Sequence, residues 1–182
     1  MKRSTLSILS LVAAVVLGGA TASAQSTSLT LSATIVTPIS ASATAPLAFG
    51  TISKGSAATV GASSASAAGV SFSGDESDNV TISIPSTVTI ATTSGSGASM
   101  TVTLNRAATR VGTTSVQASG SALDASSGTA TTALSADASG DGVSGDGLGQ
   151  TYLWIGGSVT PSATQQRGSY TGTFTVSAAY AN

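Results

Sequence analysis

The residue types that carry most enzyme chemistry are missing or isolated in this chain. It contains no cysteine and no histidine, so neither a Ser-His-Asp triad nor a Cys-His pair can form. Three carboxylates cluster at Asp75, Glu76 and Asp78, but a glycosidase would need a second carboxylate facing them from another element. No expected strand supplies one, and we interpret the cluster as a solvated turn. We therefore expect no enzyme activity, no catalytic residue and no cofactor.

One loop has the spacing of a calcium site. Asp137, Ser139 and Asp141 place oxygens at positions 1, 3 and 5 of such a loop, and Gly142 takes position 6. Position 12, where a bidentate Glu closes the site, is Leu148, and no helical pattern flanks the loop. A flexible polar loop is the preferred interpretation, with calcium as a weaker alternative and no metal site expected.

The N-terminal residues 1–24 have the composition of a secretory signal peptide. Lys2 and Arg3 are basic, an apolar run follows from Leu6 to Leu17, and Ala24 ends a small-residue cleavage site. The apolar run is shorter than the about 20 residues that a membrane-spanning helix needs. We expect cleavage near Ala24 and a mature protein without a membrane span. It would be secreted to the periplasm, the outer cell surface or the medium.

The mature chain carries few charges and a slight acidic excess. Removal of residues 1–24 leaves four basic and seven acidic residues, a net charge of −3. Charged residues make up 7% of the sequence, against about 25% in an average soluble domain. The sequence contains no basic patch, so nucleic acid is not an expected partner. A neutral surface rich in Ser and Thr is typical of extracellular proteins that pack into arrays.

Most of the chain alternates between apolar and polar residues with a period of two, the pattern of half-buried strands. Such strands recur roughly every ten residues, which favours an antiparallel β-sandwich or barrel. No sustained helical period is present, so we expect essentially no helix outside the signal peptide. Residues 25–182 would form one domain, with an N-terminal strand in 25–38 and a flexible Gly/Ser/Asp-rich segment in 120–150. The expected strands are 29–35, 58–61, 69–73, 79–84, 88–90, 100–104, 129–135 and 152–160.

The C-terminal segment, residues 168–182, has the best strand pattern in the chain. Threonines and Ser177 alternate there with residues that would face a core. A strand at a chain end frays unless something holds it, so we expect this one to pair with another strand. The inward residues would be Tyr170, Gly172, Phe174, Val176, Ala178 and Tyr180, with Gly168 before them.

Two aromatic residues, Tyr152 and Trp154, lie on a Gly-rich strand. A tryptophan in such a place can serve as a platform on which a sugar stacks. A lone aromatic is more often part of a core or an edge, and packing is the preferred interpretation of Trp154.

Two of these features resemble the fimbrial subunits of chaperone–usher systems. The last strand of those subunits carries a glycine, alternating apolar residues and a penultimate tyrosine, and their N-terminal strand completes the groove of the next subunit. Gly168 and Tyr180 correspond to the first feature, although Tyr180 is third from the end and the cysteine pair of many such subunits is missing. The resemblance implies self-association or association with related subunits, a periplasmic chaperone and an outer-membrane usher. The candidate donor residues are Leu29, Leu31, Ala33 and Ile35.

A closer resemblance is to the DUF4402 family of secreted bacterial proteins. It rests on three short stretches, residues 46–50 (Pro-Leu-Ala-Phe-Gly), 155–159 (Ile-Gly-Gly-Ser-Val) and 168–176 (Gly-Ser-Tyr-Thr-Gly-Thr-Phe-Thr-Val). This resemblance implies an immunoglobulin-like, pilin-like β-sandwich without cysteines. The function of the family is not established, so the resemblance bears on fold more than on use.

Two functions of different classes fit these patterns. In the first, the protein is a structural subunit of a fimbria-like surface assembly, and residues 29–35 of one copy fill a groove in the next. In the alternative, the same residues pair within their own domain, and the protein is a monomeric binding or matrix module such as an adhesin or a coat component. The alternating pattern is the same in both cases, so it does not separate them.

Overall fold

A computed structural model of the chain describes residues 37–76, 78–93, 97–113, 115–117, 120–134, 136–137 and 147–181. All of them belong to one unit, Ile35–Asn182. The predicted signal peptide and the candidate donor residues Leu29, Leu31, Ala33 and Ile35 lie outside the described residues. So do Ser139 and Asp141 of the candidate calcium loop and part of the segment 120–150 that was predicted to be flexible, whose described residues include β8, β9, β10 and the start of β11.

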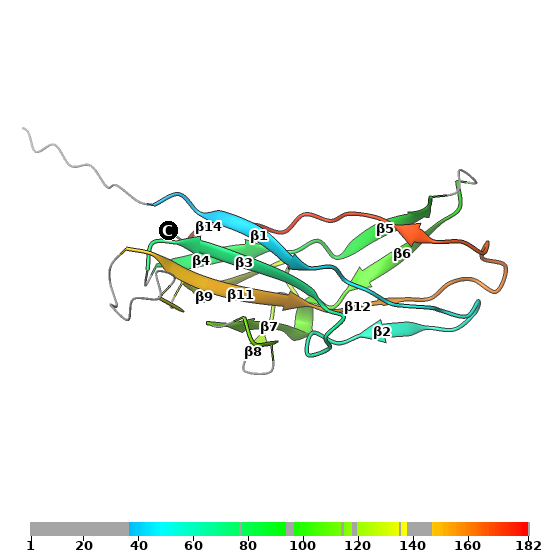
Figure 1. Ribbon diagram of the computed structural model, residues 1–182, viewed down its shortest axis with the longest axis horizontal. Coiled ribbons are helices and arrows are strands. Elements are labelled where there is room, and N and C mark those ends of the chain that lie inside the picture. The colour runs from blue at the N-terminus through cyan, green and yellow to red at the C-terminus, as the bar shows by residue number, and fades with distance from the viewer. Residues whose placement is uncertain are drawn as a thin grey trace, which may run out of the picture. The chain divides into compact units, whose positions relative to one another are not determined.

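One antiparallel sheet forms the first layer of the domain (Figure 1). Its strands follow the order β1-β3-β11-β7-β8, and β10 pairs with β11 beyond that path. Strand β1 is therefore at one edge. The bounds are β1 Ser40–Ala45, β3 Ala68–Gly74, β7 Thr109–Gly112, β8 Ser121–Leu123, β10 Ala136–Asp137 and β11 Gly149–Ile155.

Two further antiparallel sheets contain the remaining strands. One has the order β13-β5-β6-β12-β2 and the other β14-β4-β9. Strand β4 is followed by β5, and β13 by β14, so the C-terminal segment pairs first with β5 and then with β4. The bounds are β2 Ala58–Val60, β4 Asn79–Ser83, β5 Thr87–Thr92, β6 Ser99–Leu104, β9 Thr129–Ala133, β12 Gly157–Val159, β13 Tyr170–Thr171 and β14 Ser177–Tyr180.

Side chains from all three sheets share one apolar core. Phe72 and Leu153 of the first sheet, Ile82 of β4 and Val102 of β6 belong to the same buried cluster. The helical elements of the described residues are a short 3-10 turn, η1 (Arg106–Ala108), and a single further residue in 3-10 conformation, Gln117. These features confirm the predicted all-β fold, an antiparallel sandwich with almost no helix in the described part of the chain.

A single glycine lets the chain pass from one sheet to another. Strand β11 belongs to the first sheet and β12 to the second, and Gly156 separates them. A side chain at Gly156 would collide with the carbonyl oxygen of Val60 and lie 2.8 Å from the backbone nitrogen of Ala62. The backbones approach so closely here that only glycine fits.

Strands were predicted correctly where apolar and polar residues alternate. The predicted segments between residues 58 and 160 correspond to β2, β3, β4, β5, β6, β9 and the β11–β12 pair. Strand β1 was missed because its sequence, Ser-Ala-Ser-Ala-Thr-Ala, offers no large apolar residue to mark an inner face. The short strands β7, β8 and β10 were missed for a related reason, since two to four residues are too few to show a period.

The prediction of one continuous C-terminal strand is wrong. Only β13 and β14 are paired, and residues 172–176 between them belong to no strand. The ladders pair Thr171 with Ala91 and Ser177 with Ser83, so five residues (172–176) face seven (84–90). Pro85 lies in the longer stretch, where it cannot donate a ladder hydrogen bond. The two segments are therefore out of register with each other.

Candidate functional site

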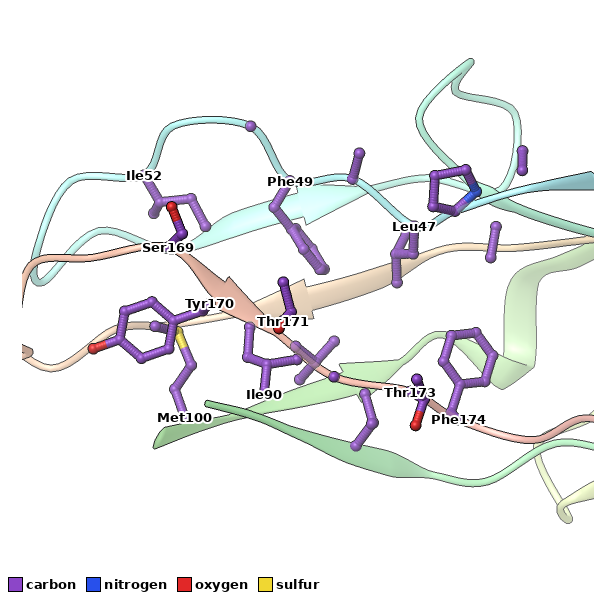
Figure 2. A pocket seen from close by; sticks show the side chains of 18 of the residues that line it. Leu47, Phe49, Ile52, Ile90, Met100, Ser169, Tyr170, Thr171, Thr173 and Phe174 are labelled. Atoms are coloured by element: carbon purple, nitrogen blue, oxygen red, sulfur yellow. The ribbon is translucent and has the colours of Figure 1, made fainter. Parts of the chain in front are cut away.

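An open groove of about 1050 Å³ runs between residues 41–54 and the C-terminal segment. β1 is the last strand of the first sheet, and β13 and β14 are the last strands of theirs, so the groove lies between free sheet edges. Figure 2 shows Leu47, Phe49 and Ile52 on one wall, with Ile90 and Phe174 across from them. The groove is apolar inside and has strand edges on both sides.

The floor of the groove is the part of the core that remains incompletely covered. Val80 and Ile82 on β4 are fully buried at 0% exposure. Val88 and Ile90 on the following strand, β5, point into the same core but are only half-buried. The half-buried apolar residues of the walls and floor are Leu47, Phe49, Ile52, Val70, Val88, Ile90, Met100, Phe174 and Val176.

The C-terminal segment lines one wall with the alternation that its sequence predicts. Phe174 and Val176 are half-buried, whereas Thr171, Thr173 and Thr175 are exposed. Gly172, which was predicted to face inward, is also exposed, although a Cβ atom there would collide with Thr89 and Ile90 of β5. Residues 172–176 have apolar side chains on the groove side and a backbone that joins no ladder.

The end of this segment nearest β13 is held by Tyr170. Its hydroxyl accepts a hydrogen bond from Gln165 Nε2 and donates one to the carbonyl oxygen of Gln166, each at 2.7 Å. The backbone N–H of Thr93 donates a hydrogen bond to the carbonyl oxygen of Ser169 at 3.2 Å. These bonds attach the segment to the turn before it and to the end of β5.

The other end is held by a junction of three residues that are far apart in sequence, Thr37, Asp75 and Tyr180. The Tyr180 hydroxyl accepts from the backbone N–H of Asp75 at 2.8 Å and donates to the carbonyl oxygen of Thr37. The N–H of Thr37 donates to Asp75 Oδ2 at 2.8 Å. We call this group the Tyr180 junction. It ties the C-terminal segment to the first described residue of the chain.

Comparison with protein families places this geometry in a known group. The model of the family described as "Domain of unknown function (DUF4402)" matches residues 22–180. The chain belongs to the DUF4402 family. No curated protein matches the chain.

In this DUF4402 domain, the predicted assembly residues fall on the groove, at its ends or beyond one end. Phe174 and Val176 line it, together with Gly168, Tyr170 and Gly172. Ala178 and Tyr180 lie beyond it on β14 and pack against the core. Sequence reasoning missed the opposite wall formed by β1 and residues 46–52. The short apolar stretch 46–50, which carries part of the family resemblance, was the available signal.

The acidic turn of the DUF4402 domain is more than a solvated loop. Asp78 donates its N–H to the carbonyl oxygen of Asp75, which confirms a turn. The solvated interpretation is wrong for Asp75, which is half-buried and receives the Thr37 N–H. Asp137 lies in β10, and its side chain is outside the described atoms. No group of three metal-ligating residues occurs among the described positions.

The single tryptophan of the domain is buried by packing and is not available on the surface. Trp154 is 6% exposed and forms a second cluster with Val60, Ala62 and Ala67. Tyr152 stacks on it, with ring centroids 6.2 Å apart and an interplanar angle of 17°. This confirms the packing interpretation and removes Trp154 as a sugar platform. The described residues also include no helix long and apolar enough to cross a membrane.

Proposed function

We propose that this protein is a secreted structural subunit that assembles with copies of itself by β-strand addition. The observation that carries the proposal is the groove, which combines an incompletely covered core with free strand edges. Exposed edges promote pairing with another chain, and most domains protect them with charges, prolines or covering elements. Strand β1 has only small Ser, Ala and Thr side chains instead.

The segment that would fill the groove is residues 29–35. Leu29, Leu31, Ala33 and Ile35 alternate with polar residues, as an added strand must if its apolar side chains are to enter pockets. Burial of each large side chain would contribute about 1.5–3 kcal/mol. Leu29, Leu31 and Ile35 would together contribute about 4.5–9 kcal/mol, which offsets much of the entropy lost when a short strand is ordered. Main-chain hydrogen bonds to residues 172–176 would add to this and define the register of the strand.

Before assembly, the open groove would be an aggregation hazard, and the proposal therefore includes helper proteins. A periplasmic chaperone would cover the groove after signal-peptide cleavage, and an outer-membrane usher would exchange it for the next subunit. A head-to-tail contact of this kind does not close on itself, so the product is a filament. Genes for a chaperone and an usher next to the gene for this protein would support this extension.

The test compares two substitutions in the N-terminal segment of the mature protein, outside the groove. Leu31→Asp places a charge on the apolar face, and Ser32→Asp places the same charge on the polar face. We expect Leu31→Asp to remain monomeric in size-exclusion chromatography and electron microscopy, while Ser32→Asp forms filaments like the unchanged protein. Equal assembly of the two variants would contradict strand addition. A mature protein that is monomeric and equally stable without residues 25–36 would favour the monomeric module.

A further inference from the structure

The Tyr180 junction bears on which copy fills the groove. Thr37 has both of its backbone polar groups engaged, the N–H by Asp75 and the carbonyl oxygen by Tyr180. Residues 37–39 form neither a turn nor a bend before β1 begins at Ser40. Pro38 further restricts Thr37 to extended conformations. The chain therefore approaches β1 along an extended path that the junction holds in place.

The residues before Thr37 are poorly suited to reverse the chain. The segment 25–36 contains no Gly, Pro, Asn or Asp, and its Ser and Thr residues support turns only weakly. It ends in Thr34, Ile35 and Val36, three β-branched residues that favour an extended strand. To enter the groove of its own domain, this segment would have to reverse direction immediately before Thr37, whose backbone is hydrogen-bonded to Asp75 and Tyr180. Sequence and junction both oppose that reversal.

The two ends of the C-terminal segment also differ in charge. Lys54 and Arg167 are exposed near the Tyr170 end, where Gly55 N–H donates to the carbonyl oxygen of Pro161. Asp75, Glu76 and Asp78 lie at the Tyr180 end, which is also where Thr37 is held. In Figure 1, the Tyr180 end lies at β14 and the Tyr170 end lies beside β5. A second copy approaching with its Thr37 end would bring negative charge to the Lys54 and Arg167 end.

We propose that the Tyr180 junction directs residues 25–36 away from the groove of their own domain, so that the groove receives this segment from a second copy, which enters at the Lys54 and Arg167 end. The inference rests on the proposed function and adds the direction of the incoming strand and the residue that positions the outgoing one. Tyr180 acts as a positioning residue in this arrangement. It does not touch the incoming strand, but it determines where the outgoing one leaves.

This direction has a definite consequence for pairing. A strand that enters at the Tyr170 end and continues toward its own N-terminus runs antiparallel to the C-terminal segment. Ile35 would then lie near Tyr170 and Leu29 near Val176. A segment folding back within one chain would run parallel to the C-terminal segment and reverse this order. Antiparallel pairing is also slightly more stable per residue.

Disulfide trapping distinguishes the two arrangements, because the chain has no cysteine of its own. Thr34→Cys is combined either with Thr171→Cys or with Thr175→Cys in the mature full-length protein. Both C-terminal positions are exposed, so neither substitution disturbs the core. We expect the Thr34 and Thr171 pair to give a ladder of covalent oligomers on non-reducing gels. The Thr34 and Thr175 pair should give no ladder and no closed monomer.

Each contrary outcome has a separate meaning. A Thr34–Thr175 disulfide within one chain would show that the segment fills its own groove and would overturn the inference. A Thr34–Thr175 ladder between chains would overturn the direction and leave assembly by strand addition intact. If neither pair forms and the protein is as monomeric as Leu31→Asp, the proposed function itself fails.

The role of the junction is tested with two matched substitutions. Tyr180→Phe removes the hydroxyl that holds Thr37, and Tyr152→Phe removes a hydroxyl that donates to Gln150 Oε1 at 2.8 Å, away from the residues that line the groove. In the Thr34 and Thr171 cysteine background, we expect Tyr180→Phe to lower the ladder yield roughly two- to tenfold, the factor that corresponds to its one hydrogen bond to Thr37. Tyr152→Phe should leave the ladder yield unchanged. Equal yields, with both variants folded, would remove Tyr180 from this role.

Discussion

Gly172 determines how closely the C-terminal segment approaches β5. A Cβ atom at this position would lie 2.6 Å from the carbonyl oxygen of Thr89 and 3.1 Å from the Cα of Ile90. Contacts that short require the segment to move away from the sheet. The glycine therefore keeps Phe174 and Val176 against the groove wall, although its own surface is exposed.

We predict that Gly172→Val destabilises the domain by about 1–3 kcal/mol, as overpacking does. Thr171→Val is the matched control, since this residue is exposed on the same segment and should change stability by less than about 0.5 kcal/mol. Urea denaturation of the monomeric Leu31→Asp background measures both without the contribution of assembly. Equal stabilities would show that the segment can shift at little cost.

At the scale of elements, the described part of the domain contains two separate clusters of buried apolar side chains. The main core lies between the sheets and is open at the groove. The second cluster contains Trp154, Val60, Ala62 and Ala67. Gln117 links its own loop to the loop that contains Ala62, because its Nε2 donates to the carbonyl oxygens of Ala62 and Ser64, the second at 2.8 Å. The Gln117 amide therefore connects two loops beside the cluster that contains Trp154.

The fluorescence of Trp154 reports on this contact between the two loops, because the chain contains a single tryptophan. We predict that Gln117→Ala shifts the emission to longer wavelength and increases quenching by acrylamide, because water reaches the ring. Ser115→Ala, a substitution at an exposed residue of the same loop, is the control and should change neither. An unchanged spectrum in Gln117→Ala would mean that the two loops cover Trp154 without this amide.

At the scale of the whole molecule, few charges are available, and those near the groove are separated by sign. Lys54 and Arg167 lie at one end of the C-terminal segment, and the acidic turn lies at the other. Exposed charge pairs contribute only about 0.2–1 kcal/mol each. Their larger effect is on the rate at which copies meet in the correct orientation, which falls as salt screens them.

We predict that Arg167→Glu slows filament growth, by roughly two- to fivefold at low ionic strength, and that added salt removes the difference. Combining it with Asp78→Lys should restore part of the rate, because positions 167 and 78 again carry opposite charges while Lys54, Asp75 and Glu76 keep theirs. Thr101→Glu, on the exposed face of β6, controls for net charge. Light scattering during assembly measures all four proteins. Slowing by Thr101→Glu to the same extent would assign the effect to net charge alone.

Local pattern was sufficient for most strands and for the inward face of the C-terminal segment. The side chains of a strand alternate between its two faces, so burial of one face is already visible in consecutive residues. The half-buried Phe174 and Val176 between exposed threonines show this directly. The same rule failed at β1, where Ser and Ala differ too little in size and polarity to indicate an inner face.

The groove and the Tyr180 junction were decided by tertiary structure. Whether Leu47 or Phe49 is covered depends on which strand edges pair, and those edges are distant in sequence. Tyr180 and Thr37 are 143 residues apart, so no local period could place one against the other. By itself, the sequence determined which residues face inward. Only the packing of β1, β5 and the C-terminal segment determined that these inward residues stay partly uncovered and line a groove.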